Sequence, residues 1–461
     1  MPETFEDLDA QLESTATSRL DAFMALLRIP SISALSEHAD DCARAAEWIA
    51  SAIRDAGLEH VEVCPTQGRP VVYADWLHAE GAPTVIVYAH YDVQPVDPLE
   101  LWHKPPFEPI VEGDHLFARG AADDKSHVAL LINAAAAWLE VRGRMPINLK
   151  VVFEGEEESG SEHLDHWLAA NRERLAADLA VISDNGFFDG NLPAITTGLR
   201  GMMYAQIDIV GPSQDLHSGG YGGTIRNPAT VLAEIVAALH DAEGRVMLPG
   251  FYDDVRPLEP QERIESARLP FDERAYLTEM GVDALYGESG YTTLERRGAR
   301  PTLDVNGLWG GFQGEGAKTI IPAHAHAKVS CRLVPDQDPL IVFEALRQQV
   351  AALTPAGVRA EVTLINTGHP SLTPLDHPAT VAAARCLEEV FGQAPLFVRE
   401  GGSIPVAASF ATILGLPVTL LGFMNADCRA HSPNEFVRLD NWESGHRATV
   451  RFWAALATAG I

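Results

Sequence analysis

Carboxylate and imidazole side chains follow the apolar segments of this sequence. Five such segments, including "TVIVYA", "NLKVVF" and "DLAVIS", are followed by His90 and Asp92, by Asp123 and Asp124, by Glu156, Glu157 and Glu158, by Asp184, and by His431. Imidazole nitrogens and carboxylate oxygens suit zinc, manganese and similar divalent ions. Such an ion lowers the pKa of bound water, so the chemistry that this set supports is metal-assisted hydrolysis.

Each of these residues has a simpler explanation when it is taken alone. A single His or Asp at the end of a strand more often forms a turn or caps a helix, and a run of glutamates usually lies in solvent. Asp123 and Asp124 can cap a helix that begins near Ser126. Independent turns, however, have no reason to supply two imidazoles and several carboxylates to one edge of a fold. The metal-site hypothesis therefore depends on the convergence of the five segments.

Spacing within two motifs predicts separate roles. Residues two apart on a strand point to the same face, so Asp92 can accept a hydrogen bond from the second ring nitrogen of His90. Within "EEESGS", neighbouring residues point in different directions. One glutamate can therefore bind a metal ion while the glutamate before it faces bound water. A carboxylate in that second place can serve as a general base.

Alternating strand and helix patterns must place these groups. Apolar β-rich runs alternate with helical segments, among them "SHVALLINAAAAWLEVRG" and a helix predicted over residues 162–175. Near-continuous apolar strands between helices are typical of an α/β layer fold with a mostly parallel sheet. In such a sheet the ligand crevice lies beyond the carboxyl ends of the strands, so we expect the five sets of polar residues to meet there.

Length and a change of pattern predict two domains. A chain of 461 residues is too long for one ordinary core. Residues 1–200 and 371–461 are predicted to form the first domain. Between them, residues 201–370 show their own alternation of helices with strands such as "MYAQIDIVG" and "AHAHAKVSCRLVP". This part is predicted to be a smaller inserted α+β domain, with loops and short helices over residues 241–300.

Composition argues against several classes of partner. With 64 acidic against 34 basic residues, the formal charge of −30 repels nucleic acid and anionic lipid. No apolar run approaches the roughly 20 residues that cross a bilayer. The five cysteines are widely spaced and form no CxxC pair, which indicates reduced thiols. The acidic start "MPETFEDLDAQ" has no apolar signal segment, so the expected location is the cytoplasm.

A series of motifs resembles a known enzyme family. "AHYDVQPV", "RGAADDKS", "FEGEEESGS", "ISDNG", "DLHSGGYGG", "AKTIIP", "SCRLVP", "REGGSIP" and "AHSPNE" occur in this order between residues 89 and 435. The order is similar to that of the dinuclear zinc metallopeptidases, which include carnosinases, cytosolic nonspecific dipeptidases, carboxypeptidase G, aminoacylases and succinyl-diaminopimelate desuccinylase. "DLHSGGYGG", "REGGSIP" and "AHSPNE" resemble the carnosinase and dipeptidase branch most.

The resemblance implies a role for each residue of the metal site. One metal ion would be held by His90, Asp123 and Asp184, and a second by Asp123, Glu158 and His431, with Asp123 bridging. Glu157 would be the general base, Asp92 would orient His90, and the peptide bond after Asp123 would be cis. Zinc is the expected metal, with manganese and cobalt as alternatives. Most relatives have glycine after the lysine of "DDK", where this chain has Ser126 and then His127. We expect these two residues to begin a helix beside the site without abolishing metal binding.

The resemblance also gives the inserted domain a function. It implies a lid or dimerisation domain in a homodimer, with His217 of "DLHSGG" stabilising the oxyanion in the neighbouring subunit's site. The implied substrate-binding residues are His217, Thr319, Arg332, Ser403 and His431. Among them, Arg332 would clamp a substrate carboxylate, aided by Thr319 and Ser403. Without the resemblance, Arg332 would be explained better as a surface ion-pair residue and His217 as an ordinary loop residue.

Three functions follow, in decreasing order of preference. The first is a metal-dependent dipeptidase. The second uses the same two metal ions on N-acyl amino acids, as a deacylase, desuccinylase or carbamoyl hydrolase. The third is a binding or scaffold protein that kept the fold and lost catalysis. It ranks last because it predicts damage at the metal positions, and every expected residue is present.

Overall fold

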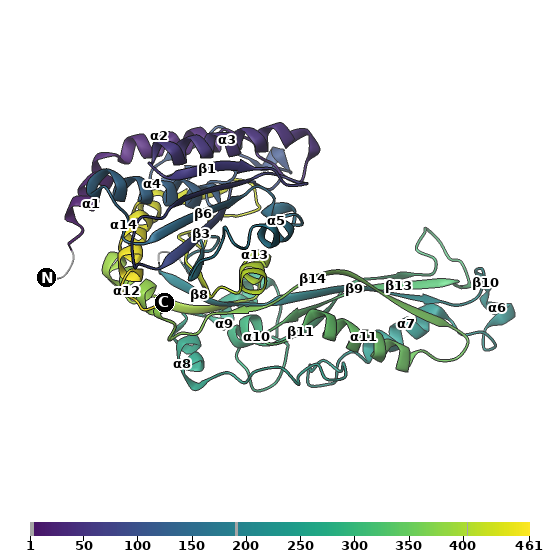
Figure 1. Cartoon of the computed structure of the whole chain (residues 1–461). Helices are drawn as coiled ribbons and strands as arrows, with labels where there is room; N and C mark the ends of the chain where they lie inside the picture. The colour runs from purple at the N-terminus through teal and green to yellow at the C-terminus, as the bar shows by residue number, and fades with distance from the viewer. Residues whose placement is uncertain (1–3, 190–191, 403) are drawn as a thin grey trace. The chain divides into compact units, whose positions relative to one another are not determined.

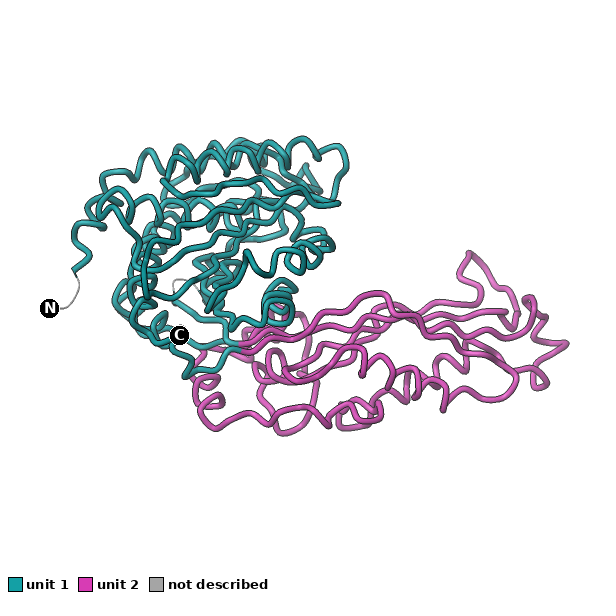
Figure 2. Tube along the Cα trace, viewed as in Figure 1, with its two compact units in different colours: residues 1–197, 373–398, 404–461 teal, residues 198–372, 399–403 magenta. Residues whose placement is uncertain are grey.

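Two compact units make up the chain (Figure 2). Unit 1 comprises residues 1–197, 373–398 and 404–461, and unit 2 comprises residues 198–372 and 399–403. The structure is a computed structural model that describes residues 4–189, 192–402 and 404–461. Every candidate metal-binding residue lies in unit 1.

Unit 1 is built on a sheet whose central strands are parallel (Figure 1). The strands follow the order β1 (Glu59–Cys64), β2 (Val71–Trp76), β6 (Asn148–Glu154), β3 (Thr84–His90), β7 (Leu179–Ile182), β17 (Val418–Leu420) and β8 (Ala194–Leu199). β6, β3, β7 and β17 run parallel, whereas β1, β2 and β8 pair antiparallel. The predicted α/β fold with a mostly parallel sheet is confirmed. The carboxyl ends of four parallel strands therefore share one edge.

Both faces of the central strands are buried, and successive side chains of each strand point into the layers on opposite faces of the sheet. In β3, Val85, Val87 and Ala89 belong to the main core. The helices that share this core are α1 (Glu6–Ser14), α2 (Ala16–Leu27), α3 (Ala39–Asp55), α4 (Lys125–Arg142), α12 (Pro378–Phe391) and α14 (Leu439–Leu456). Tyr88 points the other way, and its ring lies 5.8 Å from that of Phe410, just after α13 (Pro405–Ser409). A short helix α5 (Leu164–Ala170) replaces the longer one predicted over residues 162–175.

Helix α4 carries its first turn to this edge of the sheet. It begins directly after Asp124, and every residue from Lys125 to Ile132 is buried. It ends at Arg142, and Gly143 after it has a left-handed φ of 64°, a conformation that glycine adopts without a steric penalty. The start of the helix thus places Asp123, Asp124 and His127 beside the ends of the parallel strands.

A small three-stranded sheet fixes the segment that follows His431. Strand β18 (Phe436–Arg438) pairs with β5 (His115–Phe117), and β5 pairs with β4 (Ile110–Glu112). The N–H of Ala118 also donates to the carbonyl of Glu435 (3.2 Å). These contacts hold the chain around residue 435 against the chain that leads to Asp123.

Unit 2 is a four-stranded antiparallel sheet covered by helices on one face (Figure 1). Its order is β11 (Thr302–Gly310), β13 (His324–Leu333), β9 (Gly201–Val210) and β14 (Arg359–Gly368). Alternate residues of β9, such as Ala205 and Ile207, pack against α7 (Pro228–Ala237) and α11 (Pro339–Leu353). Beyond β9, β10 (Leu216–His217) pairs with β12 (Ile320–Ile321) and leads into α6 (Ser218–Tyr221). The helices between α7 and β11 are α8 (Pro260–Arg268), α9 (Glu273–Met280) and α10 (Thr293–Ala299).

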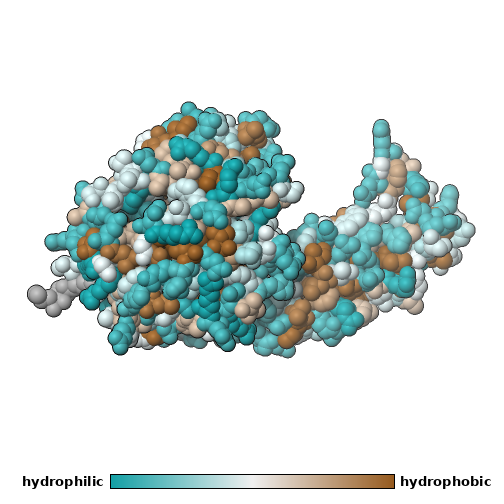
Figure 3. Space-filling model, turned by 45° about the horizontal axis from the view of Figure 1, so that its top comes forward, coloured by the Kyte–Doolittle hydropathy of each residue, from teal (hydrophilic) through white to brown (hydrophobic). Residues whose placement is uncertain are grey.

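The visible surface is mostly hydrophilic. Figure 3 shows hydrophobic residues as separate small patches among hydrophilic ones. Within the part of the chain that the structure describes, no helix has both the length and the apolar character needed to span a membrane.

Candidate metal centre

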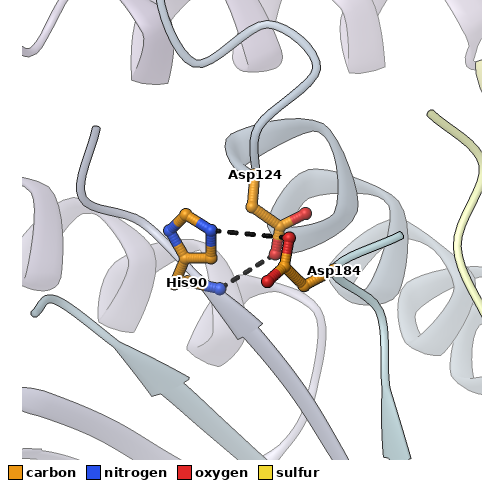
Figure 4. A group of neighbouring side chains, drawn as sticks. All are labelled: His90, Asp124 and Asp184. Atoms are coloured by element: carbon orange, nitrogen blue, oxygen red, sulfur yellow. Dashed lines mark hydrogen bonds and ion pairs between the residues drawn. The ribbon is translucent and has the colours of Figure 1, made fainter. Parts of the chain in front are cut away.

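His90 and Asp184 come together from the ends of neighbouring parallel strands. His90 ends β3, and Asp184 follows β7 by two residues. The Nε2 atom of His90 lies 3.0 Å from Oδ1 of Asp123 and 3.8 Å from Oδ1 of Asp184. Its side chain is completely buried, and Figure 4 shows the imidazole facing Asp184. These atoms form one group of convergent metal-binding donors.

A second group shares Asp123 with the first. The Nε2 atom of His431 lies 3.1 Å from Oδ2 of Asp123 and 3.1 Å from Oε2 of Glu158. His431 sits on a loop at a left-handed φ of 61°, with 56% of its side chain accessible. Asp123 therefore directs one oxygen toward each group, as a bridging carboxylate must.

Asp124 offers a carboxylate oxygen within 4.8 Å of ligand atoms of His90 and Asp184, but both of its oxygens already accept hydrogen bonds. Oδ2 accepts the backbone N–H of His90 (3.0 Å), as Figure 4 shows, and Oδ1 accepts a hydrogen bond from the ring of His127. The peptide bond that joins Asp123 and Asp124 is cis. Because both oxygens of Asp124 hold protein donors, we expect Asp123 to be the carboxylate that binds a metal ion.

The three adjacent glutamates occupy different environments. Asp92 accepts the backbone N–H groups of Glu157 (3.1 Å) and Glu158 (3.0 Å), one on each carboxylate oxygen. The Nδ1 atom of His90 lies 3.4 Å from Oδ1 of Asp92 and 3.2 Å from its carbonyl oxygen. Glu156 instead accepts from Nδ1 of His163 (2.8 Å), outside both groups. Asp92 thus contacts both the β3 end and the turn that carries the glutamates.

The electrostatics of the site favour a cation. Burial raises the pKa of Asp184 to about 8, and it also raises the pKa of Glu157 well above its usual value. Hydrogen bonds to Asp123 and Glu158 raise the pKa of His431 to about 10. Crowded carboxylates that favour a proton also favour a bound cation. Two imidazoles and three carboxylates in this arrangement fit a pair of divalent ions.

Binding of metal to this site is expected to release protons. Asp184 and His431 hold protons near pH 7 because their pKa values lie above it, whereas metal ligands must be deprotonated. The affinity for Zn²⁺ should therefore rise as the pH rises from about 6 to 8. Calorimetric titration in buffers of different ionisation heat measures the release directly. Heats that do not depend on the buffer would contradict this assignment.

Sequence reasoning gave no role to Glu435, which organises the loop before Asp123. Its carboxylate accepts the N–H groups of Gly120 (3.0 Å), Ala122 (2.9 Å) and Asp123 (3.0 Å), and the guanidinium of Arg119 (2.7 Å). The side chains of Glu435 and Arg119 are each about 1% exposed. Glu435 lies in the quoted motif "AHSPNE", but its partners are more than 300 residues away, so no local pattern indicates them.

Replacing Glu435 by glutamine is expected to destabilise unit 1. An amide group turns N–H donors toward backbone N–H groups and leaves the buried Arg119 without a counter-charge. Breaking a buried pair from one side costs about 3–5 kcal/mol. Urea unfolding of Glu435→Gln measures the loss. The control is Glu389→Gln. The side chain of Glu389 is 58% exposed and pairs with Arg451, so this substitution should cost only about 0–1 kcal/mol of stability. Equal losses in the two variants would contradict the role of Glu435.

Three further predicted site residues, His217, Thr319 and Arg332, lie at two separate ends of unit 2. His217, in β10, and Thr319, just before β12, are both exposed, and the N–H of Ser218 donates to the carbonyl of Thr319 (3.0 Å). Arg332 lies at the far end of β13, opposite the start of β9. Within one chain, therefore, Thr319 accompanies His217 and not Arg332. Ser403 lies outside the described residues.

Comparison with known proteins identifies the class. The model of Peptidase family M20/M25/M40 matches residues 86–455. The chain is 35% identical over 398 residues to the Cys-Gly metallodipeptidase dug1 of Schizosaccharomyces pombe, covering 85% of this chain and 84% of that protein. It is 31% identical over 393 residues to the Beta-Ala-His dipeptidase of Homo sapiens, covering 84% of this chain and 78% of the relative.

A solved structure agrees with these relatives. The M20 family metallo-carboxypeptidase Sso-CP2 from Sulfolobus solfataricus superposes with a TM-score of 0.83 at 31% identity, over 95% of this chain and 99% of that one. The fold and the convergent donors are therefore those of a metallopeptidase. The chain belongs to Peptidase family M20/M25/M40.

Proposed function

We propose that this chain is a dipeptidase that uses two zinc ions held in unit 1. The observation that supports it most is the placement of Asp123, whose two oxygens face His90 at 3.0 Å and His431 at 3.1 Å. Two relatives are named as dipeptidases. Zinc suits a site of imidazole and carboxylate ligands, and manganese and cobalt are the alternatives.

The ligands divide between two metal positions. His90, Asp123 and Asp184 would hold the first ion, and Asp123, Glu158 and His431 would hold the second. When bound, the two ions supply a water-derived nucleophile at neutral pH and polarise the scissile carbonyl. Asp92 positions the site by binding the N–H groups of Glu157 and Glu158.

Glu157 is the general base in this proposal. Its backbone is fixed by Asp92, and burial raises the pKa of its carboxyl group well above the usual value, which makes it a stronger base than an exposed glutamate. It removes a proton from the attacking water and delivers it to the leaving amine. Water thus adds across the amide bond, and the products are a free carboxylate and a free amine.

We further propose a homodimer in which unit 2 completes the partner's site. Strand β13 spans residues 324–333, so at about 3.3 Å per residue it separates Arg332 from His217 and Thr319 by roughly 30 Å. An extended dipeptide is only about 7 Å long. In this proposal, the oxyanion donor for a substrate clamped by Arg332 is therefore the partner subunit's His217. The partner subunit's Thr319 accompanies it.

Subunit complementation tests this arrangement. His217→Ala and Glu157→Gln are each expected to be inactive, yet coexpression should restore about a quarter of the wild-type activity, because half of the dimers then contain one intact composite site. The control pair is Glu157→Gln with Asp123→Asn, which damages unit 1 in both subunits and should restore nothing. No recovery in the first pair would show that His217 acts in its own chain or not at all.

A substrate panel tests the reaction. Zinc-loaded protein should hydrolyse Cys-Gly and β-Ala-His faster than N-acetyl amino acids with the same C-terminal residue. Faster hydrolysis of the N-acetyl compounds would overturn the assignment in favour of an N-acyl amino acid hydrolase.

A further inference from the structure

His127 is a buried residue near the metal centre that takes no part in the proposed metal binding or proton transfer. It lies on the first turn of α4 and is 1% exposed. Its Nε2 atom accepts the backbone N–H of Phe423 (2.7 Å), so the ring hydrogen must be on Nδ1. Nδ1 in turn donates to Oδ1 of Asp124. His127 therefore connects two segments that are far apart in the sequence.

Asp124 extends this connection to the end of β3. Its second oxygen, Oδ2, accepts the backbone N–H of His90 (3.0 Å). A continuous series of hydrogen bonds thus runs from Phe423 through His127 and Asp124 to His90. His90 is itself a proposed ligand of the first metal ion, and Asp124 directly follows a second, Asp123.

The Phe423 end of the series reaches the third ligand of the same ion. Residues 421–424 run beside residues 182–187, where Leu421 N–H donates to the carbonyl of Ile182 (3.0 Å) and Phe187 N–H to that of Met424 (2.8 Å). The backbones touch so closely that a Cβ on Gly422 would lie 1.9 Å from the carbonyl oxygen of Asn185. Asp184 lies within this contact. The hydrogen bonds of His127 therefore join the segments that carry His90, Asp123 and Asp184.

The ligands peculiar to the second metal position are held by other groups. Glu158 receives its backbone support from Asp92. The loop of His431 is held at Asn434, whose side chain accepts the N–H of His103 (2.7 Å) and donates to the carbonyl of Leu101 (2.9 Å). Neither set of contacts includes His127. Apart from the shared Asp123, the series of hydrogen bonds therefore supports only ligands of the first position.

We propose that His127 is a positioning residue for the first metal position, where it fixes the mutual placement of His90, Asp123 and Asp184. This inference rests on the dinuclear site proposed above. It assigns His127 no direct contact with metal or substrate. Residues that support metal ligands in this way typically change metal affinity by about 10–100-fold when replaced.

His446 provides a matched control, because it is also a buried histidine with both ring nitrogens engaged. Its Nδ1 donates to the carbonyl of Trp442 (2.7 Å), and its Nε2 accepts from Arg19 (3.0 Å) and Asn133 (3.2 Å). None of these partners is a proposed ligand or adjoins one. If burial alone explained His127, replacing either histidine would lower stability and leave metal affinity unchanged.

Two substitutions at His127 break the series at different links. In His127→Asn, the amide nitrogen keeps the bond to Asp124 and loses Phe423. In His127→Gln, the amide oxygen keeps the bond to Phe423 and loses Asp124. Because the series must be continuous to position the ligands, both variants should weaken the first metal position. Agreement between two variants with different residual bonds guards against a folding defect in either one.

The experiment titrates Zn²⁺ into the full-length chain after removal of metal by a chelator. Glu158→Gln provides a background that retains only the first position, and Asp184→Asn one that retains mainly the second. In the Glu158→Gln background, both His127 variants should lower Zn²⁺ affinity by roughly 10–100-fold. In the Asp184→Asn background they should change it by no more than a few-fold. His446→Asn should leave Zn²⁺ affinity unchanged in both, and the Tm of each metal-free variant reports its folding.

The outcomes separate this inference from the proposed function. Unchanged affinity in the Glu158→Gln background, or equal losses in both backgrounds, would overturn the role of His127 while leaving the dinuclear site in place. Failure of the chain with all its native residues to bind Zn²⁺ would overturn the dinuclear site itself.

Discussion

Glu157→Gln is expected to lower kcat for dipeptides by about 10²–10⁴-fold while both metal ions stay bound. Glutamine has nearly the same shape but cannot take a proton from water and return it to the leaving amine. The Asp92 contact survives, because it involves the backbone N–H of residue 157 and not its side chain. Steady-state kinetics together with metal analysis of the same sample measures both quantities.

The adjacent residue Glu156 supplies the control for this experiment. It accepts from His163 and takes no part in either group of donors. Glu156→Gln should therefore retain turnover and bound metal, although it removes the same negative charge as Glu157→Gln and lies directly before it in the chain. If Glu157→Gln lost metal in proportion to activity, Glu157 would be a ligand and not a base. Turnover that survived the substitution would support a protein that does not use this site for catalysis.

Asp123→Asn is expected to remove bound metal from both positions and to lower kcat/KM by roughly 10³-fold or more, since metal contributes several kcal/mol to the stabilisation of the transition state. An amide offers one neutral oxygen, whereas the carboxylate places an oxygen 3.0 Å from His90 and another 3.1 Å from His431. Metal content per chain, measured after dialysis, should fall well below two.

Asp124→Asn distinguishes the two adjacent aspartates. Both oxygens of Asp124 accept protein hydrogen bonds, so its replacement should mainly weaken the first position and spare the second. If Asp124→Asn removed both ions and Asp123→Asn only one, the assignment of the bridging ligand would have to be reversed.

The strand pattern of the sequence was sufficient to predict which segments meet. Apolar runs ending at His90, Glu154 and Ile182 predicted parallel strands, and these are β3, β6 and β7 of one sheet. Because parallel strands share a carboxyl edge, the polar residues that follow them had to converge. The confirmed fold class and family follow from this pattern and from the ordered motifs. The individual roles of the site residues stay predictions.

Other features depend on contacts that no local pattern records. The choice between Asp123 and Asp124 depends on which carboxylate is already hydrogen-bonded, by His90 and His127. His431 reaches the site from a loop at a left-handed φ, 11 residues after β17 ends at Leu420. Glu435 acts on backbone groups more than 300 residues earlier. Long-range hydrogen bonds of this kind become visible only in the folded chain.

Zinc titration of the metal-free, full-length chain, with hydrolysis of Cys-Gly followed at each addition, tests the central claim most directly. Metal removal should abolish turnover, and activity should reach its plateau at two Zn²⁺ per chain, because Asp123 brings both positions to the same site. Hydrolysis by the metal-free chain at the rate of the loaded chain, or a plateau at a single ion, would contradict the dinuclear mechanism.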